Sequence, residues 1–205
     1  MTLQNQHSIS STNYKLIINS HGAELAGLYW KDLDHNWIWS GDSWKRHAPI
    51  LFPIVGRLKN DRYTVNGSSY ELSQHGFARD MEFSVTEASA NAITFKLTSS
   101  TKTFEKYPFH FDLFVRYEVS NDDMAVTFKV HSKEEIYFSI GWHPAFVFPD
   151  QKSLMEDLRV AWEKPQTSYH LLSKEGLIAP EALMMPSPLN IEPSTFQKDA
   201  LIFKE

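Results

Sequence analysis

Alternation of apolar and polar residues is the main signal along the middle of the chain. It runs through residues 81–88, 92–98, 111–119 and 124–131. In the second of these stretches, AITFKLT, the residues Ile93, Phe95 and Leu97 are predicted to face inward. The intervening Thr94 and Lys96 are predicted to face outward. A period of two is typical of a β-strand with one buried face, and short polar turns between such strands favour antiparallel pairing.

The N-terminal part of the chain continues this β pattern. It predicts strands at residues 14–19 (YKLIIN), 23–30 (AELAGLYW) and 36–39 (NWIW), with a turn at residues 20–22. In residues 81–88, Phe83 and Val85 are predicted to share one face. No stretch has the period of a long amphipathic helix, and residues 102–107 could form only one short helical turn. We therefore predict an all-β, antiparallel protein.

The pattern weakens after Pro149. Residues 153–163 (SLMEDLRVAWE) fit a helix or a strand equally well, and the proline-rich residues 179–194 predict an extended loop. The last residues, 199–205 (DALIFKE), look like the start of a new apolar strand. Because a domain rarely ends by opening a strand, we expect residues 1–205 to form a single domain that is incomplete at its C-terminus.

The stretch between residues 49 and 80 carries the first candidate chemistry. An apolar run in PILFPIVGRL (residues 49–58) predicts a buried strand that ends at Gly56 and Arg57. His75 and Gly76 follow in QHGFARD (residues 74–80), with Arg79 four residues after the histidine. Polar side chains at the end of a buried strand often line the rim of a cleft.

Residues 137–148 (YFSIGWHPAFVF) repeat this arrangement. An apolar run reaches Gly141, and His143 then precedes Pro144, which cannot donate a hydrogen bond to a strand ladder. If His143 lies beside His75 and Arg57, two imidazoles and one guanidinium would face a shared pocket. Such a pocket suits a neutral, hydroxyl-rich ligand whose reaction needs proton transfer. The alternative is that the arginines are surface charges and His75 is a turn residue.

Composition narrows the class of protein. The 205 residues are 42% hydrophobic and 14% aromatic, which is typical of a globular chain. A net charge of −5 with scattered Lys and Arg argues against nucleic acid or an anionic membrane as the partner. Cysteine is absent, which fits a cytoplasmic protein, and the first residues do not resemble a signal peptide. No apolar run approaches the ~20 residues that span a bilayer.

Other chemistries have little support in the sequence. Several histidines leave a zinc site open as an alternative, but neither an H-x-H nor an H-E-x-x-H pair is present. The chain has no G-x-S-x-G nucleophile elbow, no G-x-G-x-x-G fingerprint and no P-loop. We therefore expect no metal and no nucleotide cofactor.

Five motifs in this order resemble the aldose 1-epimerase (galactose mutarotase) superfamily, and its LacX-like branch in particular. They are AELAGL (residues 23–28), PILFPIVGRLKN (49–60), QHGFARD (74–80), KYPFHFDL (106–113) and GWHPAF (141–146). The resemblance covers the chain from about residue 14. It implies a large antiparallel β-sandwich, the galactose mutarotase-like supersandwich, with a sugar cleft on one side.

The resemblance also implies roles for individual residues. Arg57 would bind the sugar, His75 would contact its hydroxyls or ring oxygen, and His143 would be the general acid at the ring oxygen. Asp199, in KDALIF, matches a sugar-binding aspartate of the family. The family's general-base glutamate has no match, because Glu192 precedes Asp199 and so lies in the wrong order.

The function that the resemblance implies is the interconversion of α and β anomers of a hexose, without a cofactor. A non-catalytic carbohydrate-binding protein on the same fold is an alternative, since fold does not settle function. A hexose-6-phosphate 1-epimerase is another, because Arg79 and Arg46 could hold a phosphate. A hexose is the expected partner in each case, and the oligomeric state is not readable from the sequence.

Overall fold

The chain forms two compact units, Met1–Val147 and Phe148–Glu205. The structure, a computed structural model, describes residues 5–33, 35–147, 159–185, 188–191 and 194–203. Antiparallel strands make up most of the regular structure, as predicted, and the one α-helix of the described residues is a single turn. No helix in these ranges is long and apolar enough to cross a membrane. That the chain is one domain, incomplete at its C-terminus, stays a prediction.

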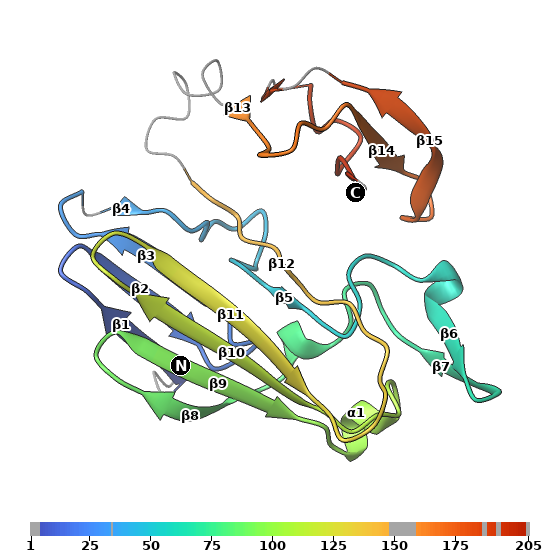
Figure 1. The fold of residues 1–205 in the computed structure, drawn as a ribbon, viewed down its shortest axis with the longest axis horizontal. Coiled ribbons are helices and arrows are strands. Elements are labelled where there is room, and N and C mark those ends of the chain that lie inside the picture. The colour runs from blue at the N-terminus through green and yellow to red at the C-terminus, as the bar shows by residue number, and fades with distance from the viewer. Residues whose placement is uncertain (1–4, 34, 148–158, 186–187, 192–193, 204–205) are drawn as a thin grey trace. The chain divides into compact units, whose positions relative to one another are not determined.

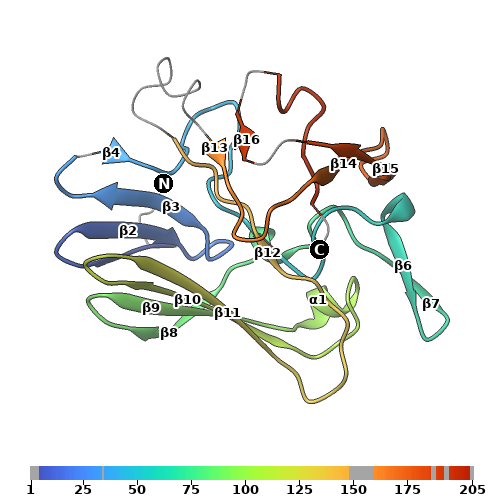
Figure 2. The same ribbon diagram turned by 45° about the horizontal axis from the view of Figure 1, so that its top comes forward.

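Two four-stranded antiparallel sheets build the first unit (Figure 1). The first sheet has the order β1 (Gln6–Ser10), β2 (Tyr14–Asn19), β3 (Leu25–Trp30) and β4 (His35–Asn36). The second has the order β11 (Met124–His131), β10 (Asp112–Val119), β9 (Ala92–Thr98) and β8 (Ser84–Ala88). Figure 2 shows the two sheets as neighbouring layers from a second side.

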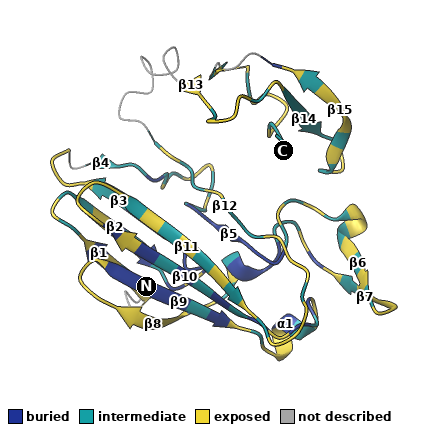
Figure 3. Ribbon diagram, in the orientation of Figure 1, coloured by how far each residue is buried: buried dark blue, intermediate teal, exposed yellow. Residues whose placement is uncertain are grey.

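The two sheets share one hydrophobic core. Leu16 and Ile18 of β2 are fully buried together with Phe95 of β9 and Val115 of β10. The same strands carry the dark buried segments in Figure 3. This confirms the inward direction predicted from the period of two. The hydroxyl of the buried Tyr117, in β10, donates a hydrogen bond of 2.8 Å to the carbonyl of Ala23, just before β3. This bond links the two sheets through the core.

Removing that hydroxyl is a direct test of the core. In a Tyr117→Phe variant the buried carbonyl of Ala23 loses its donor, so we expect the free energy of unfolding to fall by about 1–3 kcal/mol. Tyr63→Phe is the matched control, because the Tyr63 hydroxyl donates a bond of 2.8 Å to the Lys106 carbonyl at an exposed site. Urea denaturation should show a clearly smaller loss for the control. Equal losses would contradict the buried position of the Tyr117 bond.

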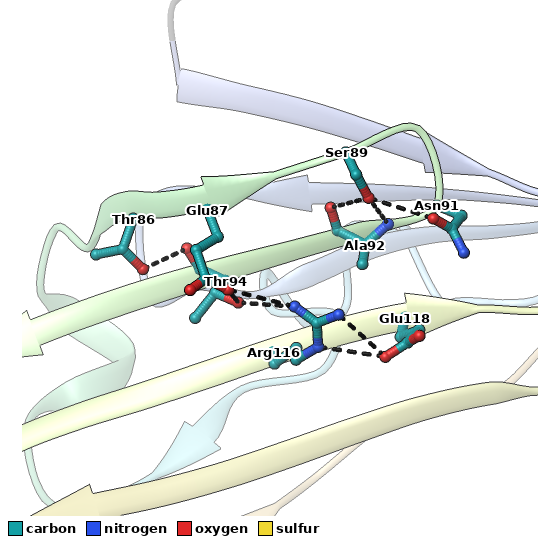
Figure 4. Close-up of polar contacts among 8 residues, drawn as sticks. All are labelled: Thr86, Glu87, Ser89, Asn91, Ala92, Thr94, Arg116 and Glu118. Carbon is teal, nitrogen blue, oxygen red and sulfur yellow. Dashed lines mark hydrogen bonds and ion pairs between the residues drawn. The ribbon is translucent and has the colours of Figure 1, made fainter.

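The outer face of the second sheet is polar, as Figure 4 shows around Arg116. The Arg116 guanidinium lies 3.5 Å from the Glu87 carboxylate and 3.2 Å from that of Glu118. It also donates to the Thr94 hydroxyl at 3.3 Å. Thr94 is therefore only 7% exposed although it was predicted to face outward, because these longer side chains cover it.

Details at the edges of this unit differ from the prediction. Val85 is the direct partner of the buried Phe95 in the β8–β9 register and so shares its face, but it is 37% exposed because β8 is the edge strand of the sheet. A hairpin of β6 (Arg62–Val65) and β7 (Ser68–Glu71) was missed. Its signal was present in the sequence: Asn66 and Gly67 both have positive φ, as a two-residue hairpin turn requires. The short helical turn is confirmed as α1 (Thr101–Phe104).

The apolar run at residues 50–55 forms a much shorter strand than predicted. Only β5 (Ile50–Leu51) pairs, with β12 (Gly141–Trp142). The run then leaves the ladder, since Pro53 has no N–H to donate. The carbonyl of Phe52 instead accepts bonds from the N–H groups of Phe77 and Ala78, at 3.0 and 3.2 Å.

The described residues of the second unit form two strand pairs. β13 (Arg159–Val160) pairs with β16 (Leu189–Asn190), and β14 (Ser168–Leu172) pairs with β15 (Ile178–Met184). The loop predicted for residues 179–194 thus contains strands. β15 accommodates Pro180 because the β14–β15 register shifts between His170 and Leu172, opposite this proline. Of the undecided residues 153–163, those up to 158 lie outside the described residues. The predicted final strand contributes one bridge, from Ile202 to His170.

Candidate functional site

Three segments that are distant in sequence meet around β5 in the first unit. β5 pairs with β12, and His143 continues this contact by donating its backbone N–H to the Pro49 carbonyl at 3.1 Å. On the other side, Phe52 forms a parallel bridge with Gly76. The rings of His75 and His143 consequently lie 6.4 Å apart, centroid to centroid. The predicted convergence of these two histidines is thus seen in the structure.

His75 is held by Gly56 through two hydrogen bonds. Its backbone N–H donates to the Gly56 carbonyl at 2.8 Å, and its Nδ1 accepts the Gly56 N–H at 3.0 Å. Because Nδ1 accepts, the proton of the neutral ring resides on Nε2. The backbone of His75 has a φ of 67°. The ring therefore presents a fixed N–H donor.

The surroundings of His75 keep its imidazole neutral. Burial, together with the positive charges of Arg79, His143 and Arg46, lowers the pKa of His75 from 6.5 to about 4. The hydrogen bond from Gly56 acts in the same direction, since a protonated Nδ1 could not accept it. At neutral pH, His75 is a hydrogen-bond donor through Nε2 and not a charged acid.

This lowered pKa predicts a pH-dependent stability. Between about pH 6.5 and 4, the unfolded His75 takes up a proton while the folded one stays neutral. The unfolded state binds more protons in this window, so the free energy of unfolding should fall as the pH falls. In His75→Asn the slope should be shallower, because asparagine does not titrate, tolerates a positive φ and can accept the Gly56 N–H through Oδ1. Urea denaturation at several pH values measures both slopes, and identical slopes would contradict the assignment.

His143 is exposed and lies beside an indole. The Trp44 ring packs edge-on against the His143 ring at 5.4 Å. The neighbouring Trp142 is anchored separately, since its Nε1 donates to the Ala48 carbonyl at 3.1 Å. His143 therefore combines a backbone fixed by Pro49 with a ring that remains accessible.

Arg57 follows Gly56 and so starts next to His75, but its guanidinium is engaged elsewhere. Its Nε donates to the Asp61 carboxylate at 2.9 Å, an i,i+4 pair across the 3₁₀ turn η2 (Lys59–Asp61). About 40% of the Arg57 side chain is exposed. Asp61 was not predicted as the partner of Arg57, although it lies four residues further along the sequence.

Two further arginines, Arg79 and Arg46, lie near enough to His75 for their charges to lower its pKa. Arg79, in the 3₁₀ turn η3 (Ala78–Asp80), donates through Nη2 to the Gln74 carbonyl at 2.8 Å. Arg46 binds the Asp80 carboxylate at 2.8 Å and reaches the Arg79 carbonyl at 3.5 Å. Burial and the nearby charge of Arg46 lower the pKa of Arg79. Its buried Nε has no hydrogen-bond partner among the described residues.

The remaining predicted residues lie in the second unit or outside the described residues. Asp199 is exposed, has a φ of 71° and donates its N–H to the Phe196 carbonyl at 3.1 Å. Its role in sugar binding stays a prediction. Glu192 lies outside the described residues. Within the described ranges, no group of three or more His, Asp or Glu side chains could hold a metal ion.

Comparison with known proteins gives consistent matches. Residues 5–178 match the family model described as "Aldose 1-epimerase". The LacX proteins of Lactococcus lactis subsp. lactis, plasmid and chromosomal, are 28% identical over 158 residues, or 73% of this chain and 52% of theirs. The chain thus spans about half the length of these curated relatives.

Two solved structures are similar over nearly the whole chain. A galactose mutarotase related enzyme from Lactobacillus acidophilus is 33% identical, with a TM-score of 0.90 over 98% of this chain and 69% of that one. A galactose mutarotase-like protein from Lactobacillus casei is 28% identical, with a TM-score of 0.80 over 97% of this chain and 67% of that one. The galactose mutarotase-like fold inferred from the five motifs is therefore confirmed.

Proposed function

Because the chain belongs to the aldose 1-epimerase family, we propose that it interconverts the α and β anomers of a hexose by acid/base opening of the sugar ring. The observation that carries this proposal is the pair of imidazoles 6.4 Å apart, one exposed and one held neutral. Two imidazoles on different segments can form hydrogen bonds with different oxygens of one sugar. The reaction needs proton transfer at two oxygens, and histidine is suited to it near neutral pH.

In the proposed mechanism, His143 protonates the ring oxygen O5 while a base removes the proton from the C1 hydroxyl. The C1–O5 bond breaks, its electron pair stays on O5, and C1 becomes an aldehyde. Rotation about C1–C2 and re-addition of O5 to the other face then give the other anomer, and the protons return to O1 and the acid. His75 donates its Nε2–H to a sugar oxygen and orients the ring.

The arginines have supporting roles in this scheme. Arg57 would bind a sugar hydroxyl, which requires its guanidinium to use donors other than the Nε that holds Asp61. No residue is assigned to the base. Asp61 and Asp80, two carboxylates of these segments, are each held in an ion pair by an arginine. Asp199 is a candidate for binding hydroxyls.

Anomeric exchange measured by NMR tests the proposal. The chain is added to galactose and to glucose near pH 7, and α/β exchange is compared with buffer and with an equal concentration of heat-denatured protein. The denatured control matters because free imidazole groups themselves accelerate mutarotation. Faster exchange with the folded chain alone supports the activity. Selective broadening of sugar signals without faster exchange would instead indicate a carbohydrate-binding protein.

The two arginines favour one second candidate, a hexose-6-phosphate 1-epimerase. The charge of Arg46 lies close enough to Arg79 to lower its pKa, and the buried Nε of Arg79 has no hydrogen-bond partner in the described part of the chain, with the Asp80 carboxylate 3.8 Å away. A dianionic phosphate would supply acceptors for both groups. Glucose 6-phosphate should then exchange faster than glucose at equal concentration, and Arg46→Gln should remove that difference. Equal rates for both sugars would rule this candidate out.

A further inference from the structure

A cavity of about 540 Å³ lies at one end of the β8–β11 sheet. Its lining comes from three segments, residues 98–99, 110–112 and 131–134, where β9 and β11 end and β10 begins. None of the residues assigned to the epimerase reaction lines it. The volume falls within the range of small-molecule sites in proteins.

One row of side chains across three strands forms the base of this cavity. Thr98, Asp112 and His131 are direct neighbours in the β9–β10–β11 register, so they share the outer face of the sheet. Asp112 accepts the Thr98 hydroxyl at 2.7 Å and lies 3.0 Å from the Lys96 ammonium. Burial alone would raise the pKa of Asp112, but these hydrogen bonds and the charges of Lys96 and His131 lower it. Asp112 is therefore a fixed carboxylate.

Hydrogen bonds also fix a second part of the lining, which comes from the residues next to this row. The Ser132 hydroxyl donates to the His110 carbonyl at 2.7 Å, and the His110 N–H donates to the Glu134 carboxylate at 2.7 Å. The Glu134 N–H donates in turn to the Ser132 hydroxyl at 3.2 Å. The Phe104 ring packs edge-on against the His110 ring at 4.5 Å. Since both parts are held in place, a ligand would not have to order them.

Hydrogen-bond donors and hydrogen-bond acceptors are both available to a ligand in this cavity. The side chains of His131 and Lys133 have no hydrogen-bond or ion-pair partner among the described residues and can donate to a ligand. Asp112 and Glu134 offer carboxylate oxygens that accept from hydroxyls. An anion would meet two carboxylates here, and no group of the described His, Asp or Glu residues suits a metal ion. A neutral molecule with several hydroxyls can use donors and acceptors together.

We propose that this cavity is a second binding site, which takes a neutral saccharide. The site does not depend on the proposed epimerase reaction, since it shares no residue with it. It also gives a role to the KYPFHFDL motif (residues 106–113), which supplies His110 and Asp112 but no group for that reaction.

Histidine side-chain NMR on the whole chain tests the site. Lactose and galactose are titrated into a His75→Asn, His143→Gln background, in which the epimerase site is impaired, and the ring signals of His110 and His131 are followed. We expect saturable shifts of these two rings with Kd on the order of 1–10 mM, equivalent to about −4 to −3 kcal/mol. A His131→Ala, Lys133→Ala double variant removes only side chains without such partners, so it should fold and bind at least about tenfold more weakly.

Each outcome decides for or against the site. Saturable shifts of the His110 ring whose Kd rises at least about tenfold in the double variant support it, whether or not the chain accelerates anomeric exchange. Shifts that stay linear with sugar concentration would overturn it. So would tighter binding of galacturonate or inorganic phosphate than of lactose, because the cavity would then be an anion site. Saturation unchanged in the double variant would also refute it.

Discussion

Replacing Gly76 with alanine is expected to destabilise the protein by about 3–5 kcal/mol, the upper end of single-residue effects. A Cβ on Gly76 would lie 2.2 Å from the carbonyl oxygen of Phe52 and 2.5 Å from its carbon, both backbone atoms. No side-chain rotation can relieve that contact. The φ of Gly76 is also 69°, which L-residues with a Cβ rarely adopt.

The matched control for this prediction is Gly67→Ala in the β6–β7 turn. Gly67 has a φ of 81°, but an added Cβ would meet no atom within 4 Å. Gly67→Ala should therefore lower the free energy of unfolding only by the cost of a positive φ, about 1–2 kcal/mol. Guanidinium denaturation of both variants gives the difference due to the close approach. If both variants lose the same stability, the contact between Gly76 and Phe52 is not as close as the structure has it.

The largest expected effect on activity comes from His143. Glutamine at this position keeps a polar side chain of similar length but cannot donate a proton as an acid. We expect a His143→Gln variant to lose the acceleration of anomeric exchange by about 10²–10⁴-fold, the usual contribution of a general acid or base. The thermal unfolding temperature should change little, because His143 is exposed and is anchored through its backbone N–H.

Two further variants separate the chemistry of His143 from the loss of any histidine. His75→Asn keeps the acceptor for the Gly56 N–H but removes the Nε2 donor, so it should raise KM more than it lowers kcat. His21→Gln removes a half-exposed histidine that pairs with Glu82, and its rate should equal that of the parent chain. Full activity in His143→Gln would refute its role as the acid.

The sequence predicted the strands of the second sheet well because their faces differ in polarity. In β10 every second residue is buried, as the alternation of apolar and polar residues in its sequence predicts. In β9 the predicted inward residues Ile93, Phe95 and Leu97 are buried, and Ala92 and Thr94 are buried as well. The run at residues 50–55 was harder to predict, because its burial is set by contacts with residues 76–78 and not by a long sheet. The β6–β7 hairpin was missed because its strands are polar and mostly exposed, so that only Asn66-Gly67 marked it.

The candidate site could be predicted as a set of segments but not as a set of side-chain contacts. A histidine beside a glycine at the end of an apolar run made His75 and His143 candidates for a shared pocket, and the structure places their rings 6.4 Å apart. Arg57 pairs with Asp61, and Arg46 pairs with Asp80. Each pair depends on the conformation of the arginine side chain and not on the backbone alone. The hydrophobic periodicity of the sequence does not indicate which carboxylate an arginine side chain will bind. The part that Asp199 would play stays a prediction.

The double hydrogen bond accepted by Phe52 ties the candidate site to the interior of the first unit. The ring of Phe52 is fully buried and packs against Phe77, Tyr107, Phe111 and Phe138. Its carbonyl oxygen meanwhile holds the segment that follows His75. We therefore expect that heating frees the His75 imidazole only when the aromatic cluster around Phe52 unfolds. Release of the ring and unfolding of the first unit should then occur in one cooperative transition.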